Sequence, residues 1–124
     1  MQDEKRFKPY GRIVFPGRKN NVIENPHDIA YCKADDHYID IYFKDEKRMN
    51  QAVCLKYIES RLDPDVFLRC HKSYIINMEY VKSYWYYEKY IIVKLCDANQ
   101  IPVSIDYVNA FGDMLQYFPT ITRI

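Results

Sequence analysis

Polar and apolar residues alternate in short runs along most of this chain. The clearest run is residues 37–43, His-Tyr-Ile-Asp-Ile-Tyr-Phe, in which Ile39, Ile41 and Phe43 fall on one side of an extended backbone. A period of two residues is typical of a β-strand with one buried face. Runs of the same kind predict further strands at residues 12–15, 20–24, 29–34, 48–53, 80–87 and 90–95, with a short last strand through residue 103.

Turn-forming residues separate these runs. The turns are expected at Pro16-Gly17, Asp35-Asp36, residues 44–47, Glu88-Lys89 and residues 97–99. Such residues favour tight connections, so neighbouring strands are expected to pair antiparallel.

Two segments carry the spacing of an amphipathic helix instead. In residues 54–62 the side chains of Leu55, Ile58 and Leu62 share one face. A similar apolar stripe follows residue 104, where we expect Ser104 to cap a helix and Pro119 to end it. The expected fold is therefore mainly β, with two short helices.

Composition and charge narrow the possible classes. The chain has 124 residues, 48% of them apolar, which suits one compact domain. Its sequence contains neither a run that approaches the roughly 18 apolar residues of a membrane span nor a signal peptide, so we expect a cytoplasmic protein without a membrane partner. Residues 1–20 carry six Lys and Arg against two acidic residues, and residues 1–11 are expected to be a basic tail or linker. The remainder holds 12 basic and 15 acidic residues, which weakens a nucleic-acid interpretation made on charge alone.

The cysteines and histidines do not indicate catalysis or a metal site. Four cysteines, at positions 32, 54, 70 and 96, have no C-x-x-C spacing and are expected to be reduced and largely buried. Cys70 and His71 are neighbours on an expected strand, where they would point to opposite sides. With three glycines in the whole chain, the sequence lacks a glycine-rich anion loop. The spacing of His27, Cys32 and His37 fits no usual zinc pattern. We therefore expect no enzyme, no cofactor and no metal.

The run Phe67–Asn77, Phe-Leu-Arg-Cys-His-Lys-Ser-Tyr-Ile-Ile-Asn, places polar residues between two apolar clusters. It predicts a strand that ends in a polar corner and then resumes. His71 is expected to point inward and hold this corner by a hydrogen bond, while Lys72 points outward. Asn77 is expected to bond to the backbone at this corner too. Ser73 can offer its hydroxyl to a helical turn or its backbone N–H to a phosphate.

This run closely resembles the F-x-R-[CIV]-H-[RKN]-S-[YF]-[IVL]-[IVL]-N signature of the LytTR DNA-binding domain family. Residues 29–39 and the Ile-Pro-Val-Ser stretch at 101–104 resemble further family motifs in the same order, so the resemblance covers about residues 12–118, with 119–124 as a C-terminal tail. It implies an elongated stack of small antiparallel sheets. It also implies a sequence-specific DNA-binding domain of a bacterial transcriptional regulator in a two-component system, following a receiver domain in a longer parent chain. In the family, loops enter successive major grooves at direct repeats, as side-by-side copies that form a dimer on double-stranded DNA.

By position, the resemblance implies base contacts by His37 and Lys72. We add Lys33, Arg69 and Ser73 as further DNA contacts near them. The family also has a basic residue after the Ile-Pro-Val-Ser stretch, where this chain has Ile105 and Asp106. A carboxylate there repels phosphates and can only accept a hydrogen bond from a base. Two interpretations therefore stay open: a DNA-binding domain, or a protein-interaction module of the same fold with weak or lost DNA binding.

Overall fold

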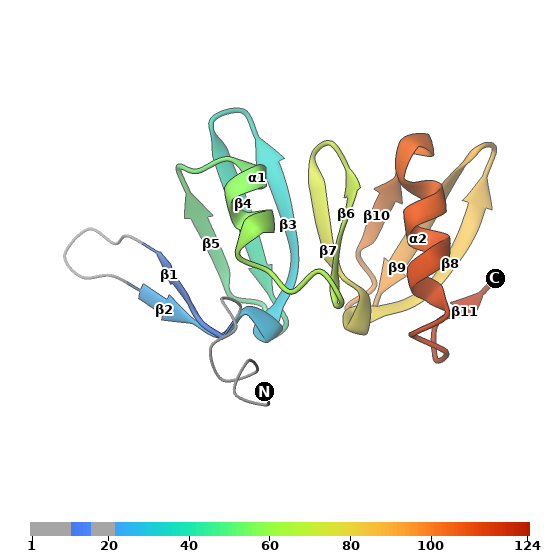
Figure 1. Ribbon diagram of the computed structural model, residues 1–124, viewed down its shortest axis with the longest axis horizontal. Helices are drawn as coiled ribbons and strands as arrows, with labels where there is room; N and C mark the ends of the chain where they lie inside the picture. Colours follow the sequence, from blue (N-terminus) through green and yellow to red (C-terminus); the bar gives the residue numbers. More distant parts are fainter. Residues whose placement is uncertain (1–10, 16–21) are drawn as a thin grey trace, which may run out of the picture.

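The computed structural model describes residues 11–15 and 22–124, and these form three small sheets in a row along the long axis of the molecule (Figure 1). The basic tail expected at residues 1–11 lies outside the described residues except for Gly11, as does the expected Pro16-Gly17 turn. The mainly β, elongated arrangement confirms the predicted fold class.

The first sheet, here called the N-terminal hairpin, pairs β1 (Ile13–Phe15) antiparallel with β2 (Val22–Glu24). A 3₁₀ turn, η2 (Pro26–Asp28), leads into the second sheet. The described strands of this central sheet run in the order β5-β4-β3-β7-β6 and all pair antiparallel. Their bounds are β3 (Ile29–Asp35), β4 (Tyr38–Phe43), β5 (Arg48–Gln51), β6 (Phe67–His71) and β7 (Tyr74–Asn77).

A second 3₁₀ turn, η3 (Met78–Tyr80), leads into the C-terminal sheet, in the order β10-β9-β8-β11. Its strands are β8 (Val81–Tyr87), β9 (Tyr90–Leu95), β10 (Gln100–Val103) and β11 (Thr122–Arg123). β11 lies in the segment expected to be a tail. It pairs parallel with β8, and the N–H of Ile124 donates to the carbonyl of Tyr84 over 2.8 Å. The sequence stretch is too short to show a period, so pattern reasoning missed it.

Both predicted helices are present, but they begin and end at other residues than predicted. α1 (Leu55–Ser60) follows Cys54, and α2 (Val108–Leu115) is preceded by the 3₁₀ turn η4 (Ile105–Tyr107). The prediction that Ser104 caps the last helix is wrong, since its side chain makes no capping hydrogen bond to a described residue. Its backbone is used instead: the N–H donates to Cys70 O over 3.0 Å, and the carbonyl accepts from Tyr107 over 2.8 Å.

Two hydrophobic cores hold the sheets together. The first lies between one face of the central sheet, α1 and the N-terminal hairpin, and is centred on Ile41, Ile58 and Phe15. The second joins the central sheet to the C-terminal sheet and α2, around Ile76, Val93 and Phe111. Because both faces of the central sheet are partly covered, buried and exposed positions do not alternate strictly there: Asp40, on the face opposite Ile39 and Ile41, is only 4% exposed.

The prediction that the cysteines are reduced and largely buried is confirmed only in part. All four are free, as expected, but only Cys32 and Cys70 are buried. Cys54 and Cys96 are exposed because they lie in connections, one just before α1 and one just after β9. Among residues 11–15 and 22–124, no helix is both long and apolar enough to cross a membrane.

Candidate nucleic-acid interface

Connections that are far apart in the sequence lie along one edge of the molecule, the upper edge in Figure 1. We call this edge the loop edge. It consists of the β3–β4 turn at Asp36-His37, the β6–β7 turn at Lys72-Ser73, the β8–β9 turn at Glu88-Lys89, and the segment from β10 into η4 at residues 104–107. The predicted contacts His37 and Lys72 are thus brought to the same edge.

His37 lies at the tip of the first turn. The sequence pattern placed it at the start of a strand, but Asp35 pairs with Tyr38, which leaves Asp36 and His37 as the connecting residues. Asp36 adopts a left-handed conformation with φ of 58°, which an aspartate tolerates better than most residues and which suits a tight hairpin. The imidazole is 88% exposed, and its Nε2 lies 3.7 Å from the Asp36 carboxylate. His37 is therefore free to approach a partner.

A β-bulge shapes the second turn. Arg69 pairs with Ile75 and His71 pairs with Tyr74, so Cys70 is an extra residue in β6. A bulge increases the local twist and changes the direction of the strand that follows. Cys70 fills the space inside, fully buried. The predicted corner in the signature run is therefore a bulged strand end followed by the Lys72-Ser73 turn.

His71 holds this turn by a hydrogen bond, as predicted, although the residue is only half-buried. Its Nδ1 accepts a hydrogen bond from the backbone N–H of Ser73 over 3.0 Å, which places the proton of the neutral ring on Nε2. The ring meets Tyr74 edge-on at a centroid distance of 5.6 Å. Burial, together with the positive charges of Lys72 and Arg69, lowers the pKa of His71. The neutral form is the one that can accept from Ser73.

Arg69 holds the same turn from its other side. Its Nε–H donates to His71 O over 3.0 Å and its Nη2 donates to Lys72 O over 2.6 Å. Nη1 also pairs with Glu59 of α1 at 3.2 Å, and the side chain is 22% exposed. These bonds give Arg69 a positioning role that the sequence did not indicate, because nothing in the spacing links it to Glu59. A direct contact of Arg69 with DNA stays a prediction.

Ser73 connects the two turns. Its carbonyl accepts from the N–H of Ala34 over 2.8 Å, near the end of β3. The β3–β4 and β6–β7 turns are therefore fixed relative to each other. The expectation that the Ser73 N–H is open to a phosphate is wrong, since that N–H already donates to His71. Lys72 beside it is exposed, as predicted.

Two other predicted residues lie away from the tips. Asn77 is fully buried at the opposite end of β7; its Nδ2 donates to Ile29 O over 2.9 Å, and its Oδ1 accepts from the Glu79 N–H over 2.9 Å. Asn77 does bond to backbone, but the prediction that it holds the polar corner is wrong, because its bonds join β3 and η3. Lys33 is exposed on the face of β3, opposite Asp40 in β4. A hydrogen bond from Asn50, and then one from Arg48, lower the pKa of Asp40.

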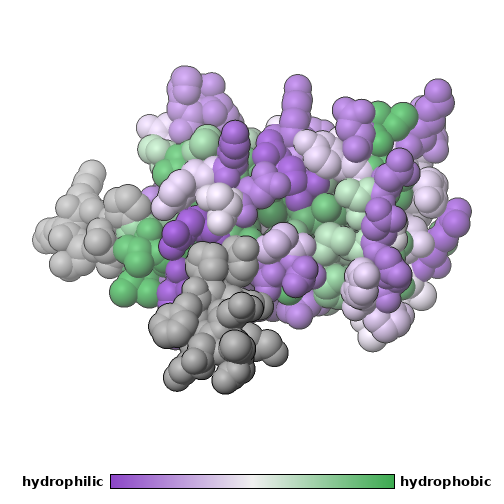
Figure 2. Space-filling model, in the orientation of Figure 1, coloured by the Kyte–Doolittle hydropathy of each residue, from purple (hydrophilic) through white to green (hydrophobic). Residues whose placement is uncertain are grey.

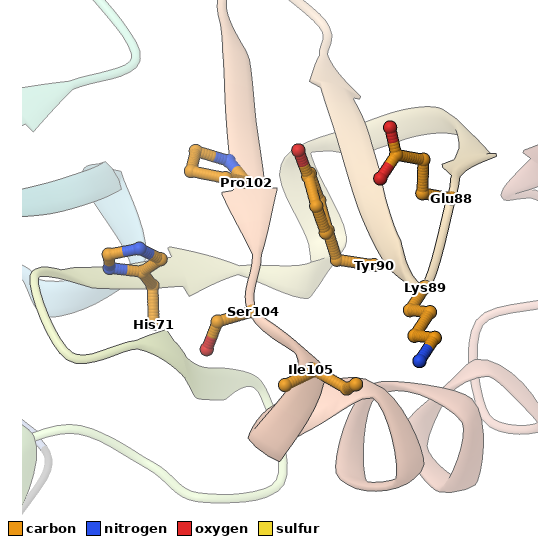
Figure 3. Close-up of a pocket in the computed structure, with 7 residues that line it drawn as sticks. All are labelled: His71, Glu88, Lys89, Tyr90, Pro102, Ser104 and Ile105. Carbon is orange, nitrogen blue, oxygen red and sulfur yellow. The ribbon is translucent and has the colours of Figure 1, made fainter.

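A groove of about 810 Å³ opens beside the Lys72 turn (Figure 3). His71 stands at one end and Glu88 and Lys89 at the other, with Ser104 and Ile105 between them. Tyr90 and Pro102 complete its lining. Sequence reasoning missed Lys89 and Tyr90 as site residues. The only available signal was that Glu88-Lys89 forms a short turn, as Lys72-Ser73 does.

The loop edge is hydrophilic but not uniformly basic. Figure 2 shows polar residues covering most of its projecting tips. Its exposed charged residues carry both signs: Lys72 and Lys89 against Asp36, Glu88 and Asp106. The site is a set of fixed turns that present donors and acceptors. Its acidic residues outnumber its basic ones, so its own charge gives no net attraction for a polyanion.

Fixed turns along one edge of a small β domain are a common way to bind a partner. Comparison with known proteins identifies the class of protein to which this domain belongs. A family model described as the LytTr DNA-binding domain matches residues 19–116. The chain belongs to this family of DNA-binding domains.

Similarity to individual proteins supports this family assignment. The sensory transduction protein LytT of Bacillus subtilis is 29% identical over 96 residues, which are 76% of this chain and 39% of that protein. The heme-containing CO-sensing transcriptional regulator RcoM 2 of Paraburkholderia xenovorans is 34% identical over 90 residues, 70% of this chain and 33% of that protein. The chain thus spans well under half the length of these relatives.

The fold is also shared with a solved structure. The LytTr DNA-binding domain of a methyl-accepting/DNA response regulator from Bacillus cereus has a TM-score of 0.74 with this chain, at 21% identity. The match covers 85% of this chain and 96% of that one. It confirms the stacked small sheets as the fold of the family.

Proposed function

We propose that this chain is the sequence-specific DNA-binding domain of a bacterial transcriptional regulator, and that the loop edge is the surface that binds. The observation that carries the proposal is the β6–β7 turn. Arg69, His71 and the Cys70 bulge fix its shape, and Lys72 projects from it into solvent. The backbone of this turn is fixed before a partner binds, so the exposed lysine side chain leaves it from a defined place, which favours readout of base edges.

We propose further that the loop edge contacts two neighbouring major grooves of the DNA. The Asp36-His37 and Lys72-Ser73 turns are tied together by the Ala34–Ser73 hydrogen bond, so they would enter one groove side by side. The β10–η4 segment and the Glu88-Lys89 turn lie farther along the loop edge and would meet the next groove. Copies bound at direct repeats would then lie side by side on the duplex. A preceding receiver domain is proposed for the longer parent chain.

Selection from a random duplex library, followed by gel-shift titration at two salt concentrations, tests this function. We expect a selected sequence to bind more tightly than a scrambled duplex of equal length, with an affinity that falls as salt rises. Equal binding of the selected and scrambled duplexes, or no binding at low salt, would reject it.

A second candidate function is a protein-interaction module of the same fold. The N-terminal hairpin supports it, because Val14, Val22 and Ile23 leave apolar side chains exposed there, and Ile23 is 61% exposed. The acidic residues on the loop edge also fit this alternative. A domain that fails to bind any duplex at low salt, yet is well folded, would favour it.

A further inference from the structure

Ile105 is a large apolar side chain on the lip of the groove, and it is 57% exposed. It is the first residue of η4, and its position is fixed from both sides. Ser104 just before it donates its N–H to Cys70 O over 3.0 Å, and the N–H of Val108 donates to Ile105 O within η4. The segment is thereby attached to β6, the strand that leads into the Lys72 turn.

The surroundings of Ile105 combine apolar surface with charges of both signs. Tyr90 and Pro102 line the same groove, and Lys89 lies beyond Ile105 on the neighbouring turn (Figure 3). Lys72 projects from the turn that follows His71 at the other end. Glu88 stands beside Lys89, and Asp106 follows Ile105, so these charges largely cancel. The apolar surface itself suits a partner that brings an apolar group within reach.

Base edges in the major groove differ in whether they offer such a group. Guanine, adenine and cytosine present hydrogen-bonding atoms, whereas thymine also presents its C5-methyl group. An isoleucine side chain neither donates nor accepts a hydrogen bond. Placed in a major groove, it discriminates by making apolar contact with a methyl group and by leaving a polar edge without a partner.

We propose that Ile105, supported by Tyr90 and Pro102, reads the C5-methyl group of a thymine in the bound DNA. This inference rests on the proposed function and adds a specificity-determining residue to it. Ile105 and Lys89 would then enter the same major groove of the DNA, next to the one that Lys72 enters. The recognised sequence therefore contains a thymine whose methyl group contributes to affinity through Ile105.

Replacing thymine with deoxyuridine, which lacks only the methyl group, tests the inference. Each thymine of a selected duplex is replaced in turn, and affinity is measured for the unaltered protein and for Ile105→Ala. At one thymine we expect the replacement to weaken binding of the unaltered protein about fourfold, as for loss of one buried methyl contact. The same replacement should have little effect on Ile105→Ala, because the contact is already absent.

Ile23→Ala provides a matched control, since Ile23 is a similarly exposed isoleucine on the N-terminal hairpin. It should respond to deoxyuridine as the unaltered protein does. Circular dichroism of each variant shows that the fold is kept. As a second variant, Ile105→Arg should shift the preferred base at that position from thymine to guanine, because arginine pairs with guanine O6 and N7.

The outcomes separate the two proposals. If no duplex is bound selectively, the proposed function fails and this inference fails with it. If a sequence is selected but no thymine shows a methyl effect, the proposed function stands and the inference is rejected. A methyl effect that is equal in the unaltered protein and in Ile105→Ala would reject it too, since DNA shape and not Ile105 would then be the cause.

Discussion

Lys72 reaches solvent from a turn whose shape depends on Arg69 and His71. Arg69 satisfies two backbone carbonyls of this turn, and His71 satisfies one N–H. The conformational entropy of the turn is thus reduced before any partner binds, which favours affinity. Arg69 and His71 therefore act on DNA binding through the shape of the turn, whereas Lys72 is placed to contact the DNA itself.

Arg69→Met should lower the free energy of unfolding by about 1–2 kcal/mol, because two carbonyl groups lose a charged donor. Sequence-selective DNA binding should weaken as well, since Lys72 is no longer held. Urea denaturation and gel-shift titration measure the two effects. Glu59→Gln is the control: it removes the partly exposed ion pair but keeps the bonds to the turn, so its effect on stability should be at most about 0.5 kcal/mol. Equal losses in both variants would show that Arg69 acts mainly through Glu59.

His71 should make stability depend on pH. Its pKa is lowered in the folded state by burial and then by Lys72 and Arg69, from an ordinary value of 6.5. The unfolded chain then binds a proton more readily than the folded one, so stability is complete above about pH 6.5 and is lost as pH falls through the folded pKa.

Urea denaturation of the unaltered protein and of His71→Gln between pH 5 and 8, with the difference taken at each pH, measures this contribution. The unaltered protein should lose stability toward acid more steeply than the variant. Asp40 does not interfere, because its pKa is lowered from the ordinary 3.8 and its contribution is lost only in stronger acid than this range. Parallel curves for the two proteins would contradict the assigned role of His71.

At the scale of elements, the sequence predicted strands and turns well where side chains alternate and turn residues follow. β9 and the Glu88-Lys89 turn have the predicted bounds. The pattern could not show β11, whose pairing partner β8 is distant in the chain, or the bulge at Cys70, which depends on packing. It also could not show that Arg69 reaches α1, because no local spacing encodes that contact.

Removing residues 121–124 should expose the edge of β8. In the intact chain, β11 pairs with Ser83 and Tyr84, and Arg123 lies over the Tyr86 ring at 4.6 Å. Hydrogen–deuterium exchange in β8 should become faster, while exchange in β3, in the central sheet, should change little. Unchanged exchange in β8 would mean that β11 contributes nothing to this sheet.

For the whole molecule, the mixed charge of the loop edge predicts moderate affinity and a shallow salt dependence. Asp106 lies on this edge where the resemblance implies a basic residue. Asp106→Arg should therefore tighten DNA binding and steepen the salt dependence, because a repulsive charge is replaced by one that releases a counterion.

Lys72→Ala should reduce the slope of log affinity against log salt by about 1. A comparable Lys44→Ala change, away from the loop edge, should leave the slope unaltered.

The central claim is that the loop edge is the DNA-binding surface, and an NMR titration with a selected duplex tests it most directly. Amide signals of His37, Lys72, Lys89 and Ile105 should shift on binding. Signals of Glu46 and Ala98, which lie in turns of similar kind at the opposite edge, should stay nearly fixed. Shifts concentrated at Glu46 and Ala98 or on the N-terminal hairpin, with His37 and Lys72 unmoved, would contradict the account.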